Sequence, residues 1–171
     1  VPGDRTRPIT DRVKENLFNI LGPDLEDSAW LDLFAGTGAV GIEALSRGAA
    51  FVRFLDIQRQ AVETIQANLK ITRLQSGAQV LRQDAFALLQ QPADRQFDYV
   101  YIAPPQYQAM WLKALNLLDE NPAWLVEDAW VIVQIHPVEY EEPALANLRE
   151  FEQRKYGSTL LVFYARERPE D

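Results

Sequence analysis

Three glycines spaced as Gly36-x-Gly38-x-x-Gly41 directly follow a strand-like apolar stretch, residues 29–34. Glycine lets the backbone turn sharply and approach a ligand with no Cβ in the way, and the N–H groups of a helix start face that ligand. Asp56 ends the next apolar stretch, 20 residues after Gly36, where such folds place an acceptor for ribose hydroxyls. This order predicts a nucleotide-like ligand; a tight turn without a ligand is the alternative.

An acid four residues before the first of these glycines, Asp32, narrows the choice of ligand. It would meet a pyrophosphate as a like charge, although the glycine spacing alone also fits a dinucleotide such as NAD. An acid here suits a ligand that carries an ammonium group and no phosphate. S-adenosylmethionine combines an amino acid, a sulfonium, a ribose diol and an adenine, so it is the predicted cofactor.

The third strand-like stretch ends in Gln83-Asp84-Ala85-Phe86. The Asp84 carboxylate could accept from the adenine amino group, and the Ala85 N–H could donate to the ring. Asp84 is equally suited to cap a helix, and both roles are compatible. Phe86 could wall the pocket or belong to the core.

A fourth stretch, residues 97–102, ends abruptly in the sequence Ala103-Pro104-Pro105-Gln106-Tyr107. Two prolines in tandem lack the N–H groups that a strand ladder needs. We therefore expect the backbone to leave the sheet here with its carbonyls free.

Strand-like and helix-like stretches alternate along the chain, which predicts an α/β fold with a mostly parallel seven-stranded sheet and an antiparallel C-terminal edge hairpin. The expected strands are residues 29–34, 51–56, 78–82, 97–102, 129–135, 151–156 and 159–167. The expected helices are a first one capped by Thr10, one that ends at Gly48, residues 59–70, 85–90 and 108–118, and a short one opened by Pro143.

The composition of the chain limits the classes of protein to which it can belong. The chain has 171 residues, a net charge of −8 and no cysteine, which predicts a single domain over residues 1–171 and excludes a disulfide scaffold or a Cys-based metal site. The negative charge argues against a broad, nonspecific grip on nucleic acid. We expect no membrane span and no metal, and a cytoplasmic location; the single His136 is expected to be structural. Because the chain begins with Val, an N-terminal extension is expected to be missing.

Three segments together resemble the bacterial small-subunit (16S) ribosomal RNA guanine-N2 methyltransferases, the group specific for a guanine in helix 31. They are residues 7–21 (RPITDRVKENLFNIL), 31–49 (LDLFAGTGAVGIEALSRGA) and 97–105 (FDYVYIAPP). Weaker similarity runs through residues 149–167. The resemblance implies a Rossmann-like methyltransferase fold, S-adenosylmethionine as methyl donor, and small-subunit ribosomal RNA or the assembling small subunit as partner.

The resemblance also implies roles for individual residues. Those that match or adjoin cofactor-binding positions are Asp32, Phe34, Gly36, Gly38, Asp56, Ile57, Asp84 and Ala85. Those that match a segment over the active site, and so are substrate candidates, are Arg7, Thr10, Asp11 and Arg12. Arg12 is a candidate phosphate contact, with a surface salt bridge as the alternative for both arginines.

The proline loop departs from the family pattern of Asp-Pro-Pro followed by Tyr or Phe: Ala103 replaces the acid and Gln106 the aromatic. In the family, the target amine donates one hydrogen bond to the acid and one to a carbonyl of the loop. The predicted catalytic residues are therefore the backbone of Ala103, Pro104 and Pro105, with Tyr107 as the stacking aromatic.

Two other functions remain open. A relative that binds the cofactor but no longer transfers a methyl group could act as an RNA-binding module in ribosome assembly. An NAD-dependent oxidoreductase is suggested by the glycine spacing alone, and Asp32 and the proline loop count against it.

Overall fold

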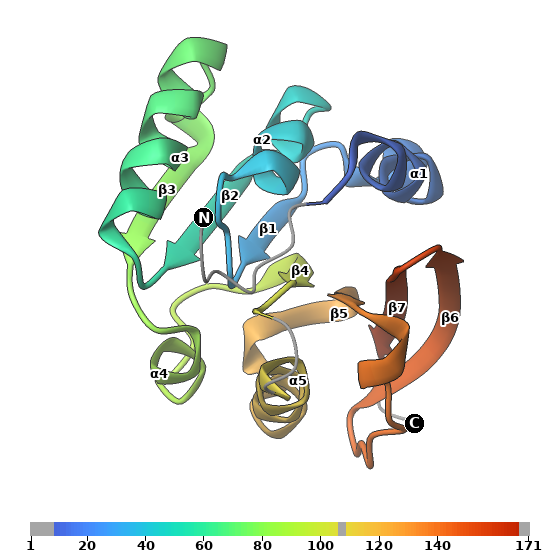
Figure 1. Ribbon diagram of the computed structural model, residues 1–171. Coiled ribbons are helices and arrows are strands. Elements are labelled where there is room, and N and C mark those ends of the chain that lie inside the picture. The colour runs from blue at the N-terminus through green and yellow to red at the C-terminus, as the bar shows by residue number, and fades with distance from the viewer. Residues whose placement is uncertain (1–8, 106–108, 168–171) are drawn as a thin grey trace.

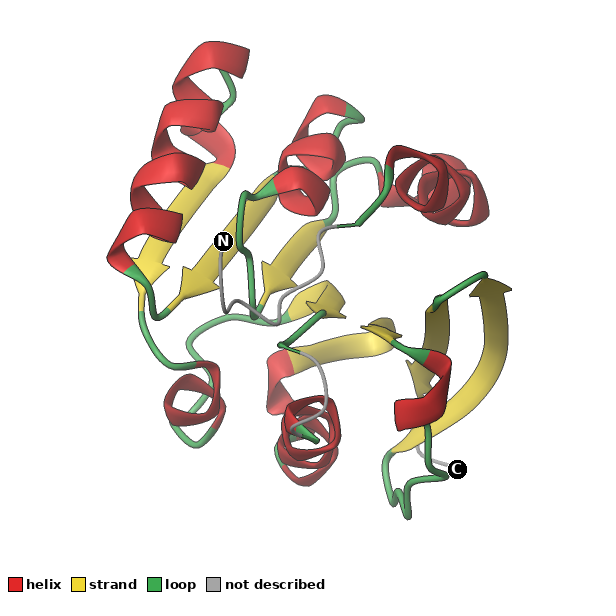
Figure 2. Cartoon of the chain, viewed as in Figure 1, coloured by secondary structure: helices red, strands yellow, loops and turns green. Residues whose placement is uncertain are grey.

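The structure is a computed structural model that describes residues 9–105 and 109–167. The described residues form one sheet in the order β3-β2-β1-β4-β5-β7-β6, with helices on both faces (Figures 1 and 2). The strands are β1 (Ala29–Asp32), β2 (Phe51–Asp56), β3 (Ala78–Arg82), β4 (Phe97–Ile102), β5 (Leu125–Ile135), β6 (Leu148–Tyr156) and β7 (Thr159–Arg166). The helices are α1 (Asp11–Leu21), α2 (Ala39–Ser46), α3 (Arg59–Thr72), α4 (Ala85–Leu89) and α5 (Met110–Glu120).

Strand direction fixes where a ligand can bind. The first five strands pair in parallel, while β7 runs antiparallel to β5 and to β6. The carboxyl ends of the parallel strands therefore share one edge of the sheet, and each is followed by a loop at that edge. The predicted α/β sheet with an antiparallel C-terminal hairpin is confirmed.

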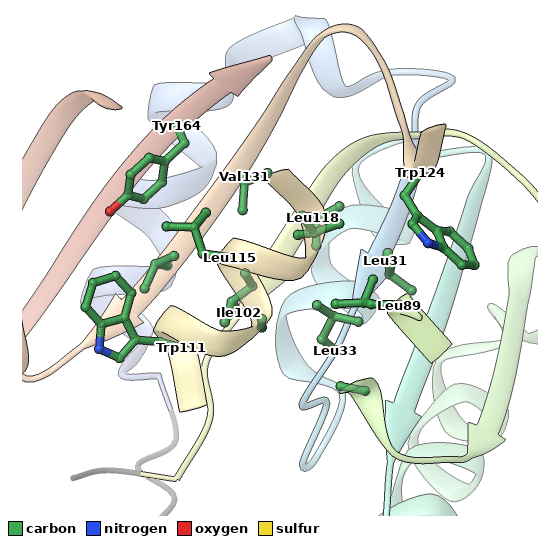
Figure 3. Close-up of a cluster of buried hydrophobic side chains, with 14 of the residues drawn as sticks. Leu31, Leu33, Leu89, Ile102, Trp111, Leu115, Leu118, Trp124, Val131 and Tyr164 are labelled. Carbon is green, nitrogen blue, oxygen red and sulfur yellow. The ribbon is translucent and has the colours of Figure 1, made fainter. Parts of the chain in front are cut away.

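Each face of the sheet carries its own core. Helices α1, α2 and α3 cover one face and α4 and α5 the other (Figure 1). On the second face, Trp111, Leu115 and Leu118 of α5 pack over the apolar side of β1, β4 and β5 (Figure 3). The four tryptophans pack as expected: Trp30, Trp111 and Trp124 are buried, and Trp130 is half-buried.

The expected short helix from Pro143 is wrong. Residues 141–147 contain no helix, and a 3-10 turn forms earlier, at Pro137–Glu139. The buried Asp119 accounts for the difference, because its carboxylate accepts from the backbone N–H groups of Ala146, Asn147 and Leu148 at 2.7–2.9 Å. These bonds hold the segment extended where it enters β6.

Several other bounds shift by a few residues. Strand β5 begins at Leu125 rather than residue 129, and β6 at Leu148 rather than residue 151. Strand β1 ends at Asp32, two residues early, and the helix expected over residues 108–118 begins at Met110.

We expect Asp119→Ala to destabilise the protein because it leaves buried N–H groups without an acceptor, at a cost of about 1–3 kcal/mol for each group left unpaired. Urea unfolding measures the free energy of unfolding. The neighbouring exposed Glu120 supplies the matched control, and Glu120→Ala should change the free energy of unfolding by less than about 0.5 kcal/mol. Equal effects of the two substitutions would contradict the anchoring role of Asp119.

Candidate active site

A cavity opens at the carboxyl edge of the sheet, beside the ends of β1, β2 and β3. It brings together six of the predicted cofactor-binding residues and one proline of the loop after β4. The cavity is lined by Leu33, Phe34, Gly36, Asp56, Ile57, Gln58, Ala61, Gln83, Asp84, Ala85, Pro105 and Met110. Segments that are far apart in the sequence, around residues 34, 56, 84 and 105, thus form one site.

The three glycines after β1 do different things. Gly36 and Gly38 have positive φ angles of 57° and 82°, which glycine adopts without strain. A Cβ added at Gly36 would meet nothing within 4 Å, whereas one at Gly41 would lie 2.3 Å from the Phe54 ring. Gly36 thus leaves space at the cavity, and Gly41 lets α2 pack closely on β2.

Asp56 is fixed by two backbone donors. Its carboxylate accepts from the N–H of Gly36 at 3.0 Å and from the N–H of Gln58 at 2.9 Å. Each carboxylate oxygen has a second lone pair for another donor. Asp56 therefore both ties the glycine loop to the end of β2 and presents acceptors to the cavity, as a ribose diol requires.

Asp32 is a buried acid with an unsatisfied oxygen. Its exposed fraction is 2%, and among the described residues its Oδ1 has no hydrogen-bond partner. Burial, reinforced by repulsion from Asp56, raises the pKa of Asp32 to about 7, although a hydrogen bond from the Phe34 backbone opposes the rise. Buried polar atoms are rarely left unpaired, so this carboxylate fits a ligand that brings a cationic donor.

Asp84 is the predicted helix cap and also borders the cavity. Its side chain caps α4 by accepting from the Ala87 N–H at 2.9 Å, and the residue also lines the cavity. Phe86 packs edge-on against Phe34, with ring centroids 6.0 Å apart. Phe34 lines the cavity and Phe86 does not, so Phe86 packs behind Phe34.

The loop after β4 contributes Pro105 to the cavity. Ala103 is half-buried and Pro104 is buried; Ala103 packs against the core under α1. The chain leaves the ladder after Ile102, where β4 ends, which confirms the expected exit from the sheet. Gln106 and Tyr107 lie outside the described residues.

The segment expected over the active site is described from Ile9 onward, so Arg7 lies outside it. Thr10 caps α1 by accepting from the Val13 N–H at 3.3 Å. Asp11 and Arg12 are exposed in the first turn, and no ion pair of Arg12 occurs among the residues that the structure describes. The salt-bridge interpretation of Arg12 therefore finds no partner there.

His136 has the expected structural role. Its Nδ1 accepts from the Val138 N–H, and its own backbone N–H donates to Glu139. Within residues 9–105 and 109–167, no three His, Cys, Asp or Glu side chains gather as metal ligands would. No helix in those residues has the length and apolarity needed to cross a bilayer.

Sequence reasoning missed a buried polar pair beneath the proline loop. The hydroxyl of Tyr101 on β4 donates to the side-chain carbonyl of Gln134 on β5, and the exposed fractions are 3% and 7%. Burial raises the pKa of Tyr101 well above its usual range. The only signal was the single amide in the otherwise apolar stretch 129–135.

Comparisons with known proteins agree with these observations. Residues 1–165 match the family model described as "Conserved hypothetical protein 95". The chain is 40% identical over 167 residues to "Putative rRNA methyltransferase YlbH" of Bacillus subtilis (strain 168), covering 96% of this chain and 90% of that protein. It is 35% identical over 162 residues to "Ribosomal RNA small subunit methyltransferase D" of Escherichia coli (strain K12), covering 94% and 80%.

A solved structure from Escherichia coli, "Putative methyltransferase yhhF", superposes with a TM-score of 0.86 at 32% identity, covering 94% of this chain and 88% of that one. The expected Rossmann-like methyltransferase fold is thereby confirmed. The chain belongs to the conserved hypothetical protein 95 family and, with it, to the small-subunit ribosomal RNA methyltransferases that its motifs resemble.

Proposed function

We propose that this protein binds S-adenosylmethionine and methylates the exocyclic N2 amine of a guanine in small-subunit ribosomal RNA. The observation that carries the proposal is the single cavity that joins Gly36, Asp56 and Asp84 to Pro105 of the proline loop. A cofactor site and a loop suited to hold an amine thus meet at one place. The relatives' names, which specify ribosomal RNA, support the substrate class, and such a substrate would place the protein in the cytoplasm.

Different residues of the site bind different parts of the cofactor. Asp56 accepts from the ribose hydroxyls, while Asp84 and the Ala85 N–H recognise the adenine edge, between the side chains of Phe34 and Ile57. Asp32 pairs with the ammonium of the amino acid, and Gly36 and Gly38 let the backbone approach it. Oδ1 of Asp32, which has no hydrogen-bond partner within residues 9–105 and 109–167, is the atom that best supports this orientation.

When bound, S-adenosylmethionine supplies a methyl group whose bond to sulfur breaks, its electron pair passing to sulfur, as the lone pair of the target nitrogen forms the new N–C bond. The chain contributes position more than acid–base chemistry. Carbonyls of Ala103 and Pro104 accept from the amine, Tyr107 stacks on the base, and the proton that the amine loses passes to water. Arg7, Thr10, Asp11 and Arg12 approach the RNA, with Arg12 on a phosphate.

Ala103 favours one other candidate, a module that binds cofactor and RNA in ribosome assembly without transferring a methyl group. The test is single-turnover transfer of radiolabelled methyl to small ribosomal subunits from cells that lack this protein, with the modified nucleoside identified by mass spectrometry. N2-methylguanosine supports the proposal. Absence of transfer by protein that binds both S-adenosylhomocysteine and subunits would overturn it in favour of the binding module.

Asp56→Ala should weaken S-adenosylhomocysteine binding in calorimetry, because it removes charge-assisted hydrogen bonds worth about 1.5–3 kcal/mol, or roughly 10- to 100-fold in Kd. Glu63→Ala is the control, since Glu63 is an exposed acid on α3 paired only with Arg59 among the described residues. An unchanged Kd for Asp56→Ala would refute the assignment of the ribose site.

The affinity for S-adenosylhomocysteine should depend on pH through Asp32. Because the pKa of Asp32 is raised to about 7, its carboxyl group is mostly protonated below pH 7 in the ligand-free protein. This carboxyl group must ionise to pair with the ligand ammonium. The Kd should therefore rise by up to about tenfold per pH unit from pH 7 to pH 5. Asp32→Asn should bind more weakly at pH 8 and lose this dependence.

The same carboxyl should leave a signature in stability. Asp32 has a higher pKa in the folded chain than the ordinary value of about 3.9, so the folded state binds more protons between about pH 4 and pH 7. The free energy of unfolding should fall across that window as pH rises. In urea unfolding, Asp32→Asn should thus have a higher free energy of unfolding than the native sequence at pH 8, and this difference should disappear near pH 4. The control Asp24→Asn, at an exposed position, should show no such difference. A uniform effect at both pH values would contradict the shifted pKa.

Ala103→Asp should raise the single-turnover rate by about tenfold or more, because a carboxylate adds a charge-assisted acceptor for the amine. Ala103→Val, of similar size but with no acceptor, is the matched control and should not raise the rate. Equal rates in the two variants would mean that position 103 does not face the target amine.

A further inference from the structure

A side chain that lies outside the cavity holds the glycine loop that borders it. This loop, residues 33–38, connects β1 to α2 and contributes Gly36 to the cavity. The side-chain amide of Asn68 on α3 donates from its Nδ2 to the backbone carbonyl of Thr37 at 3.0 Å. Asn68 does not line the cavity itself. The contact therefore ties the cofactor loop to a helix that stands behind the site.

The loop needs such a contact because it turns through two glycines. Gly36 and Gly38 have φ angles of 57° and 82°, and glycine loses more conformational freedom on folding than any other residue. Thr37 lies exposed between them, so its peptide group can reorient unless something fixes it. The amide of Asn68 fixes the carbonyl of this one residue between the two glycines.

The Asn68 contact is one of three that hold the loop. The N–H of Gly36 donates to the carboxylate of Asp56 at 3.0 Å. On α3, Ile65 is fully buried and packs so close to Gly38 that a Cβ there would lie 3.3 Å from the Ile65 side chain. Residues three apart lie on the same face of a helix, so Ile65 and Asn68 approach the loop together. The end of β2 thus holds an N–H group of the loop, and α3 holds a carbonyl.

A loop that is already in place lowers the cost of binding a ligand. A ligand that must order a segment of the protein loses part of its interaction free energy to that ordering. A shift of the loop would also move Gly36 away from Asp56, the residue proposed to accept from the ribose hydroxyls. Asn68 should therefore raise the affinity for the cofactor without contacting it, and should leave the transfer step unchanged.

We propose that Asn68 is a positioning residue of the cofactor site, which acts through the Thr37 carbonyl to keep the glycine loop in the conformation that binds the cofactor. This inference rests on the proposed binding of S-adenosylmethionine in this cavity and adds a residue to it. It is independent of whether the proline loop supports methyl transfer.

The test compares single variants of the full chain by calorimetry with S-adenosylhomocysteine. Asn68→Leu has a similar size and no donor, so the Kd should rise about 3- to 10-fold. Asn68→Gln keeps an amide donor on a longer side chain and should bind more tightly than Asn68→Leu. The matched control is Gln66→Leu, which removes an exposed amide of α3 and should leave the Kd within about twofold of the native value.

Hydrogen exchange separates positioning of the loop from general stability. In ligand-free Asn68→Leu, the N–H groups of Gly36 and Gly38 should exchange faster than in the native protein. The N–H of Val52, in the middle of the sheet on β2, should keep its native rate. Saturating S-adenosylhomocysteine should slow the exchange of both glycines again. In methyl transfer to small ribosomal subunits, Asn68→Leu should raise the KM for S-adenosylmethionine and leave kcat unchanged.

The outcomes are distinguishable. An unchanged Kd for Asn68→Leu overturns this inference alone, and so do equal Kd values for Asn68→Leu and Asn68→Gln. Faster exchange at Val52 as well as at the glycines would assign Asn68 to general stability and would also overturn it. A native protein that binds S-adenosylhomocysteine but transfers no methyl group overturns the proposed transferase function and leaves this inference standing. A native protein that does not bind S-adenosylhomocysteine overturns both.

Discussion

Parallel pairing of β1 to β5 is the constraint on which the rest of the structure depends. It places the carboxyl ends of these strands at one edge of the sheet, so the loops that follow adjacent strands are neighbours. Gly36, Asp56 and Pro105 are distant in sequence, yet they border one cavity because their strands are adjacent in the sheet. The antiparallel β7 extends the sheet beyond β5 without adding another loop of this kind.

The electrostatics of this edge favour a cation over a phosphate. Asp56 is stabilised by two backbone N–H groups, whereas Asp32 is buried without a partner for Oδ1 among the described residues and is repelled by Asp56. A negatively charged ligand would add to that repulsion, while a cationic one would relieve it. This is why the glycine spacing, which by itself fits a dinucleotide, is better explained by a ligand that carries an ammonium and a sulfonium.

Local patterns predicted the features that depend on local chemistry. The glycine loop, the Thr10 cap and the proline exit from β4 each follow from the preferences of a few consecutive residues. The absence of a helix after Pro143 does not, because it depends on Asp119, which lies 27 to 29 residues before the N–H groups that it binds. The Tyr101–Gln134 pair was missed for the same reason: only the β4–β5 register brings the two residues together.

The chemistry of methyl transfer also bears on how the loss of an acid at position 103 should be judged. Methyl transfer from a sulfonium to an amine depends on holding the lone pair in line, and a neutral acceptor in a fixed position can do this without a base. A residue-by-residue comparison of motifs shows only that the side chain of Ala103 has no acceptor. The backbone carbonyls of the loop do not depend on which residue stands at position 103, so they can still accept from an amine. A departure from a linear motif is therefore evidence of lost activity only after the backbone acceptors of the altered segment have been considered.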